Sequence, residues 1–266
     1  MQYNCFLVGA AVLAVGCDAP ETPPAAIDSD EPAAVVCAAT AGGNGGAGGV
    51  VLLASTQPDL EGLLDGVVHA DPGDAGLGGE GDLAMSAPDG APGEADGDVE
   101  FALADGFAFD RARVDPAHTI EISVSGTNVI SLPELSDPPE IRVEELRIRS
   151  GASLAISCDT RIVAAHLIVE VGASLVFQAR NQNTCTWSMP AHAAQPGLAG
   201  AKVFIEAGTV TLDGTIDVSG GDGLPGAPGG AGGGLTIRAE TFEVGPAARI
   251  LATVGHGGDG ADEGPC

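Results

Sequence analysis

The chain has 266 residues, enough to bury a core without the help of metals or dense disulfides, so its size excludes no ordinary globular class. Its charge is more restrictive. The sequence holds 37 acidic and 10 basic residues, which gives a formal net charge of -27, and no Lys or Arg precedes Arg111. Nucleic acid and anionic membrane surfaces are therefore not expected as partners, because their charge would be repelled.

The first seventeen residues, MQYNCFLVGAAVLAVGC, predict a secretory signal. The apolar run from Phe6 to Val15 is too short to span a bilayer and is followed by small residues and Cys17. The LAVGC ending resembles the lipobox of bacterial lipoproteins, which implies that Cys17 is lipidated and is the chain's only contact with the membrane. The alternatives are cleavage without lipidation and a chain that is not exported. Residues 18–37 are acidic and rich in Pro, which predicts a disordered tether.

Residues 38–98 are rich in Gly, Ala and Asp and offer few apolar side chains for packing, so we expect a loose, loop-dominated region. Within it, VVLLAS at 50–55 favours a strand. The segment LEGLLDGVVHA at 60–70 fits a helix or a strand equally well.

From residue 99 to 266 the pattern changes to short apolar alternations such as VEFALADGFAFD and HLIVEVGASLVFQA. Alternation with a period of two is typical of strands, and no helix-length periodic segment occurs among them. The fold class predicted for this part of the chain is therefore all-β.

Two internal repeats refine this prediction. LRIRSGASLAIS at 146–157 matches LIVEVGASLVFQ at 167–178 with an offset of 21 residues, and 202–223 is echoed by 234–260 with an offset of about 32 that grows to 37 at the second GGDG. A period in the twenties with turns of variable length is typical of stacked coils. We therefore predict a parallel β-solenoid similar to a right-handed β-helix, with an antiparallel β-sandwich as the alternative.

The same alignment predicts which side chains point inward. The predicted core consists of Leu146, Ile148, Leu154, Ile156, Leu167, Val169, Leu175, Phe177, Val203, Ile205, Val210, Leu212, Ile216, Val218, Leu235, Ile237, Phe242, Val244 and Ile250.

Four cysteines remain if Cys5 lies in the signal and Cys17 carries lipid: Cys37, Cys158, Cys185 and Cys266. An even number in an exported chain suggests two disulfides, and three pairings are open. Cys158 with Cys185 is preferred because the two bracket an irregular segment. None has a Cys or His at zinc-binding spacing, so no thiolate metal site is expected. Cys266 follows a Gly-rich turn directly, which leaves open whether the chain continues.

Few patterns point to ligands. Asp222 and Asp259 stand in two GGDG turns where stacked carboxylates could share calcium, although the nonapeptide calcium repeat places its Asp elsewhere. Trp187, in a polar insertion, could stack on a sugar ring or cover a disulfide. No phosphate loop is present, and the three-residue Gly period in GDGLPGAPGG is too short for collagen.

An enzyme on this scaffold would need two placed acids, and Asp213 and Asp217 are the best pair. In so acidic a chain, two neighbouring acids are also expected by chance. Arg147 and Arg149 share one face of a predicted strand, but Ile168 and Glu170 occupy the equivalent places in the next repeat, so no basic ladder forms. We therefore assign no catalytic residue and no cofactor.

The ending LAVGC, the acidic tether and the repeat TVTLDGTIDVSGGDG together resemble Gly-rich, repeat-containing surface proteins and lipoproteins of bacteria. The resemblance covers residues 1–33 and about 140–260 and carries over no functional residue. It implies a place in the bacterial cell envelope, anchored by lipid in the outer membrane or secreted, and a non-enzymatic structural or adhesive role with an unknown surface partner. The alternative is a protein that binds or degrades polysaccharide on a β-helix scaffold.

Overall fold

The chain separates into two units, residues 1–35 and 36–266. In the computed structural model, the described residues are 36–37, 41–77, 89–93, 97–129, 139–156, 158–177, 197–224, 226–259 and 264–265. All of them belong to the second unit. The predicted signal and the first part of the predicted tether lie outside them, as do Cys17, Cys185, Trp187 and Cys266.

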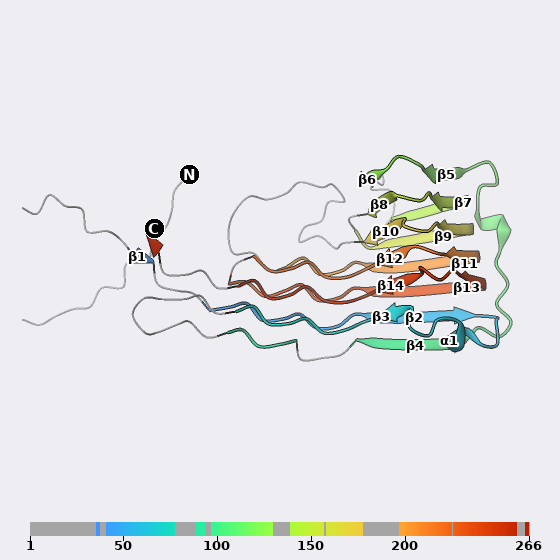
Figure 1. The fold of residues 1–266 in the computed structure, drawn as a ribbon. Helices are drawn as coiled ribbons and strands as arrows, with labels where there is room; N and C mark the ends of the chain where they lie inside the picture. Colours follow the sequence, from blue (N-terminus) through green and yellow to red (C-terminus); the bar gives the residue numbers. More distant parts are fainter. Residues whose placement is uncertain are drawn as a thin grey trace, which may run out of the picture. The chain divides into compact units, whose positions relative to one another are not determined.

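Two parallel β-sheets dominate the described residues (Figure 1). The larger has seven strands, in the order β4 (Asp98–Leu103), β2 (Val50–Ser55), β13 (Gly234–Val244), β11 (Lys202–Leu212), β9 (Thr160–Val169), β7 (Glu140–Ile148) and β5 (Thr119–Ile122). The smaller has six, in the order β3 (Val68–His69), β14 (Arg249–Leu251), β12 (Thr215–Asp217), β10 (Ser174–Phe177), β8 (Ala152–Ile156) and β6 (Gly126–Val129).

The remaining elements are short. In the described part of the chain they are helix α1 (Leu60–Leu63), the 3-10 turn η1 (Arg111–Arg113) and an antiparallel pair of β1 (Val36–Cys37) with β15 (Gly264–Pro265). The all-β prediction is therefore confirmed. Every ladder within the two larger sheets is parallel among the described residues, whereas the alternative sandwich requires antiparallel ladders.

The predicted repeat matches the strand register. Leu146 pairs with Leu167 and Leu154 with Leu175, which is the predicted offset of 21. In the later repeat Val203 pairs with Leu235, an offset of 32. The side chains of the two sheets meet in one core, and all the predicted inward residues are buried except Val244, which is half-buried. Identical spacing places like residues above one another, so each strand buries its apolar face against its neighbours.

The stacking order differs from the chain order. β2 lies between β13 and β4, although it is the first strand of the sheet along the chain. Residues 50–55 and 68–69, from the range expected to be loose, thus supply strands to both sheets. The segment 60–70 contains both α1 and β3, which are separated by a turn where Gly66 adopts a positive φ.

Residues 104–118, which we call the crossing segment, connect one edge of the larger sheet to the other (Figure 1). The chain leaves the edge strand β4 and reaches the opposite edge strand β5 through η1. On the way Val114 packs against Val163 and Ala165, which lie on the outer face of β9. The guanidinium carbon of Arg238 lies over the ring of Phe107, 4.6 Å from the ring centre.

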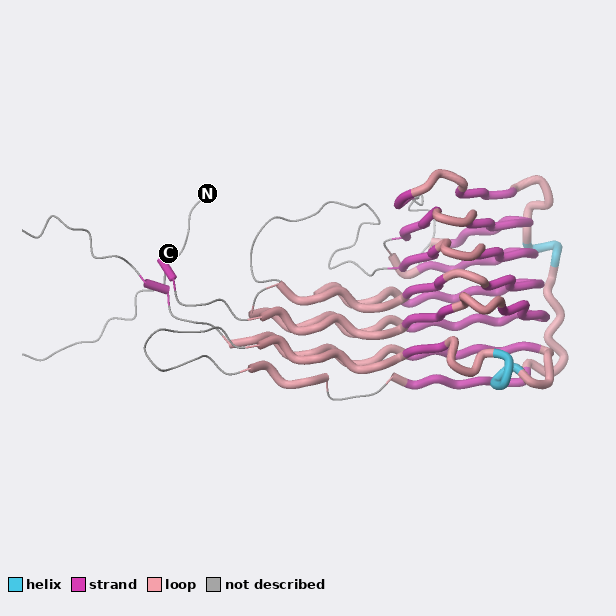
Figure 2. Tube along the Cα trace, viewed as in Figure 1, coloured by secondary structure: helices cyan, strands magenta, loops and turns pink. Residues whose placement is uncertain are grey.

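Gly-rich stretches continue the strands as extended segments that lie side by side (Figure 2). We call these the glycine tracts: 41–49, 70–77, 89–93, 197–201, 219–224, 226–233 and 252–259. Their hydrogen bonds connect different tracts in steps of three residues, as in Gly43 to Gly258 at 2.7 Å and Gly49 to Ala252 at 2.9 Å. Burial along 41–49 repeats with the same period. A three-residue repeat without internal hydrogen bonds is typical of polyproline II-like chains.

Glycine is required in these tracts because backbones approach closely. A Cβ on Gly43 would lie 1.8 Å from the carbonyl oxygen of Ala227, and one on Gly255 would lie 1.8 Å from that of Gly221. Positive φ is the reason at few of these positions; Gly226 is the one such tract residue in the described part of the chain. The three-residue spacing of Gly, too short in this sequence for a collagen triple helix, therefore serves to pack neighbouring tracts of one chain against each other.

Candidate functional site

The two acids expected to form a catalytic pair are each engaged by the backbone. Asp213 accepts a hydrogen bond from the Ala247 N–H at 3.0 Å, which holds the turn after β13. Asp217 accepts one from the Ser219 N–H at 2.8 Å, two residues further along the chain. Both contacts are typical of acids that stabilise turns.

Asp222 and Asp259 are not equivalent, which corrects the alignment of the two GGDG motifs. Asp222 lies beside His256 and accepts its N–H at 2.9 Å, whereas Asp259 accepts the N–H of Leu77 at 2.9 Å. The two tracts pair with an offset of 34 at these side chains rather than 37. A tract with a three-residue period can shift by one triplet and still keep Gly at the close contacts, so the motif alone could not determine the register.

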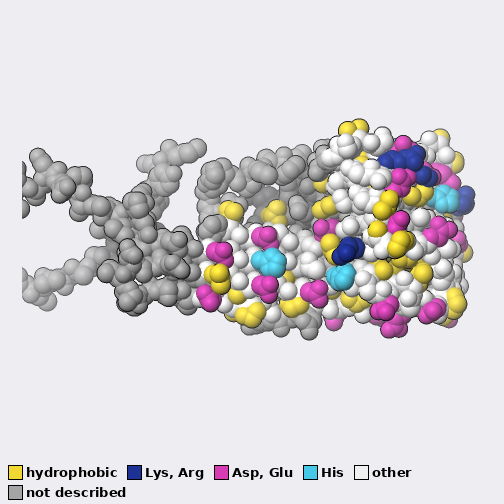
Figure 3. Space-filling view, in the orientation of Figure 1, with side chains coloured by type: hydrophobic (Ala, Val, Ile, Leu, Met, Phe, Trp, Pro, Cys, Tyr) yellow, Lys and Arg dark blue, Asp and Glu magenta, His cyan; other side chains and the backbone are white. Residues whose placement is uncertain are grey.

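These side chains form part of a regular ladder on the outside of the glycine tracts. Thr253 donates to Ser219 at 3.0 Å, and the Asp74 N–H lies 3.4 Å from Nδ1 of His256. Figure 3 shows acidic side chains spread over the face in view. In the described part of the chain, no group of three or more His, Cys, Asp or Glu could hold a metal ion. The ladder therefore connects neighbouring tracts and offers no clustered calcium ligands.

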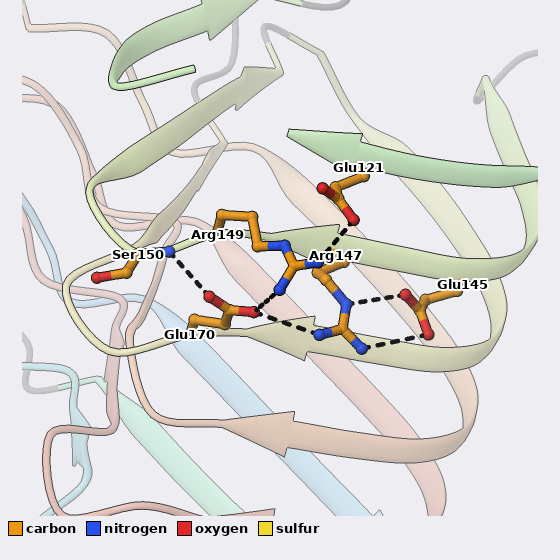
Figure 4. A network of polar contacts seen from close by, with 6 residues as sticks. All are labelled: Glu121, Glu145, Arg147, Arg149, Ser150 and Glu170. Atoms are coloured by element: carbon orange, nitrogen blue, oxygen red, sulfur yellow. Dashed lines mark hydrogen bonds and ion pairs between the residues drawn. The ribbon is translucent and has the colours of Figure 1, made fainter. Parts of the chain in front are cut away.

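A network of arginines and glutamates covers the outer face of the larger sheet near β5, β7 and β9 (Figure 4). Arg147 binds Glu145 at 2.8 Å, and Arg149 binds Glu121 and Glu170 at 3.0 Å each. Arg149 thus faces Glu170, as the repeat predicts, and the charges alternate instead of forming a basic patch.

The network shifts the pKa values of its members. Hydrogen bonding to Glu145 raises the pKa of Arg147, and Glu121 does the same for Arg149. The pKa of Glu170 is lowered, first by the Ser150 N–H that it accepts and then by the charge and hydrogen bonds of the two arginines, which outweigh the opposing effect of burial. The shifts of Arg147, Arg149 and Glu170 all favour the charged form, which is the opposite of the tuning that a proton-transfer group needs at neutral pH.

A second cluster lies where the crossing segment meets the sheet. Glu206 on β11 is buried, with 7% of its surface exposed, and binds Arg113 of η1. Arg161 on β9 binds Glu206 at 3.1 Å and stacks on Phe204, 4.9 Å from the ring centre. The hydrogen bond from Arg113 to Glu206 raises the pKa of the arginine. These contacts hold the crossing segment in place.

One pocket of about 610 Å³ lies between the segment 63–69 and the turn after β13, and no sequence pattern indicates it. Asp65, His69 and Arg249 line it together with apolar side chains. Arg249 and His69 are 180 residues apart and lie on the neighbouring strands β14 and β3. Their proximity depends on the pairing of β3 with β14, which are far apart in the chain, and no local pattern indicated this pairing.

The cysteine predictions fall partly on described residues. Cys158 is half-buried beside the core, and its carbonyl accepts the hydroxyl of Thr160 at 2.9 Å. Cys37 pairs through its backbone with Gly264, two residues before Cys266. Cys185 and Cys266 lie outside the described residues, so both disulfides remain predictions.

Comparisons with models of protein families, with curated proteins and with solved structures find no match for this chain. Within the described ranges, no helix has the length and apolar character needed to cross a membrane.

Proposed function

We propose that this protein is an exported, non-enzymatic surface protein of the bacterial cell envelope with a structural or adhesive role, built on a parallel β-solenoid. The observation that carries the proposal is the use of the acids. Asp213 and Asp217, the best candidates for a catalytic pair, and Asp222 and Asp259, the calcium candidates, each accept a backbone N–H, which supports a structural use of these acids in turns and tracts.

The solenoid is supported by the parallel register of both sheets at the offsets of the sequence repeat. Thr209 and Thr241 pair directly on β11 and β13. With the native cysteines replaced by Ser, the variant Thr209→Cys/Thr241→Cys should be captured by a short thiol cross-linker. The control pair Thr209→Cys/Thr236→Cys is offset by five residues along the strand and should react much less. Equal yields from both pairs would contradict the proposed stacking.

Export and anchoring are tested through Cys17. The wild-type chain should label with palmitate and fractionate with the outer membrane, and Cys17→Ser should abolish the label. A chain that remains unlabelled in the cytoplasm would overturn the localisation. Labelling without any change on Cys17→Ser would overturn the assignment of the anchor.

The second candidate, a polysaccharide-binding or polysaccharide-degrading protein, is favoured by the pocket beside Arg249. A screen for polysaccharide cleavage separates the two functions of this candidate. Turnover that disappears in Asp213→Ala or Asp217→Ala, with the melting temperature preserved, would replace the non-enzymatic proposal.

A further inference from the structure

Arg249 stands out among the described arginines because it neither forms an ion pair nor stacks on an aromatic ring. Six other arginines of that part of the chain bind a glutamate: Arg111, Arg113, Arg142, Arg147, Arg149 and Arg161. Arg238 stacks on Phe107. Arg249 is exposed at the pocket, makes no ion pair there, and so remains available to an anion from outside. In a chain with a net charge of -27, a guanidinium left unpaired at a pocket is a local exception to the acidic surface.

The rest of the lining fits a sugar ring. Val67, Val244 and Pro246 give the pocket apolar surface, against which the C–H face of a pyranose can pack. Asp65 can accept hydrogen bonds from hydroxyl groups, and His69 can donate or accept one. The volume of about 610 Å³ lies within the ordinary range of small-ligand sites and has room for one or two sugar units.

We propose that this pocket binds acidic saccharides, with the carboxylate of a uronate on the guanidinium of Arg249 and the ring against Val67 and Pro246. An arginine can hold a carboxylate through two parallel hydrogen bonds, which fixes the orientation of the sugar. A ligand that placed its carboxylate near Asp65 instead of Arg249 would bind less well, because the two negative charges would repel each other. The inference deepens the proposed adhesive function, on which it rests, by naming an acidic extracellular polysaccharide as the partner. The net charge of -27 repels such a ligand at long range, so its binding depends on the short-range contact with Arg249.

The test is titration calorimetry on the purified full-length protein with a galacturonate trisaccharide and with the same trisaccharide reduced to the neutral sugar. The acidic ligand should bind at least about tenfold more tightly, since charge-assisted hydrogen bonds have no counterpart in the neutral one. Arg249→Gln should remove this preference. Lys202→Gln is the matched control, because it removes one exposed positive charge outside the pocket and should leave the preference intact.

Melting curves show that both variants fold, and inorganic phosphate serves as a plain-anion probe. Equal binding of the two trisaccharides, an unchanged preference in Arg249→Gln, or no binding at millimolar concentration would overturn the proposal. Phosphate binding as tight as that of the uronate would overturn the assignment to sugars. Because binding is measured on the purified protein, its failure is separate from a failure of export, which appears only in the fractionation and labelling experiments.

Discussion

At the scale of single residues, glycine and the carboxylates contribute most to this structure. Gly151 and Gly172 adopt positive φ in the turns between the sheets, where most side chains would be strained. In the glycine tracts the reason is different, because backbones of neighbouring tracts touch where a Cβ would lie. The acids supply oxygens that accept backbone N–H groups at the edges of this packing.

A methyl group at a tract contact should therefore destabilise the protein. Gly43→Ala places a Cβ 1.8 Å from the Ala227 carbonyl oxygen, so backbone must move, and we expect a loss of about 1–3 kcal/mol. Gly234→Ala is the control: its nearest neighbour would be Lys202 Cγ at 3.8 Å, and its φ is not positive. Thermal denaturation should show a lower melting temperature for Gly43→Ala alone. Equal melting of the two variants would contradict the close packing of the tracts.

Glu170 should make stability depend on pH in the acidic range. Its pKa is lower in the folded than in the unfolded chain, so its contribution is complete above the unfolded value of about 4.3 and is lost as pH falls through the folded value. Glu170→Gln should therefore reduce stability at pH 7 by up to about 1 kcal/mol, and the difference from wild type should disappear in acid. Melting temperatures between pH 7 and pH 2 measure this. Glu61→Gln, exposed on α1, is the control and should show no such convergence.

At the scale of elements, the crossing segment decides how the first and last parts of the larger sheet are joined. It contacts β13, β11 and β9 in turn through Phe107, Arg113 and Val114. Glu206 would be a costly buried charge if it were unpaired, and Arg113 and Arg161 approach it from two sides. The crossing segment thus carries the chain from β4, at one edge of the larger sheet, to β5, at the opposite edge.

Removing Arg113 should loosen this connection. Arg113→Gln leaves the buried Glu206 with Arg161 as its remaining described cation, and we expect a loss of about 2–4 kcal/mol. Arg111→Gln is a matched control two residues away, where an arginine with a 67% exposed side chain meets Glu144 at 3.4 Å and should cost less than about 1 kcal/mol. Urea unfolding measures both, and limited proteolysis within 104–118 reports local opening. Equal losses would show that Arg113 does not anchor the segment.

At the scale of the whole unit 36–266, the stack is not ordered along the chain. β2 pairs with β13 and extends the larger sheet, and β3 pairs with β14 and extends the smaller one. The edge strand β4 pairs with the other side of β2. Val51 and Leu53 on β2 are fully buried, at 0% exposure each, so the early part of the chain completes the core formed by the later part. Most lateral contacts consequently join residues that are distant in sequence, which favours slow folding.

A chain that begins at residue 99, the boundary predicted from the sequence, should therefore be strongly destabilised. It loses β2 and β3 and exposes the apolar surface that Val51 and Leu53 cover, at about 2 kcal/mol per side chain. A chain of residues 36–266 keeps the whole unit and should melt like the full-length protein. Circular dichroism melting and binding of a hydrophobic dye compare them. A residue-99 chain as stable as the 36–266 chain would show that the early strands do not contribute to the core.

The sequence by itself determined the all-β class, many of the strands after residue 99 and the inward side chains such as Leu146 and Leu154, because alternation and the 21-residue offset are local properties of the chain. It also indicated that Arg149 faces Glu170. The alternation in 104–110 wrongly indicated a strand, since that stretch belongs to the crossing segment, and β6 was not predicted. Only the tertiary structure decided that Asp222 lies beside His256, that β2 and β3 stack beyond β13 and β14, and that Arg249 and His69 share a pocket. The physical reason is that tracts with a three-residue period can pair in several registers, and the order of parallel strands depends on which edges remain free. The register of the tracts and the order of the strands are therefore fixed only when the whole core packs.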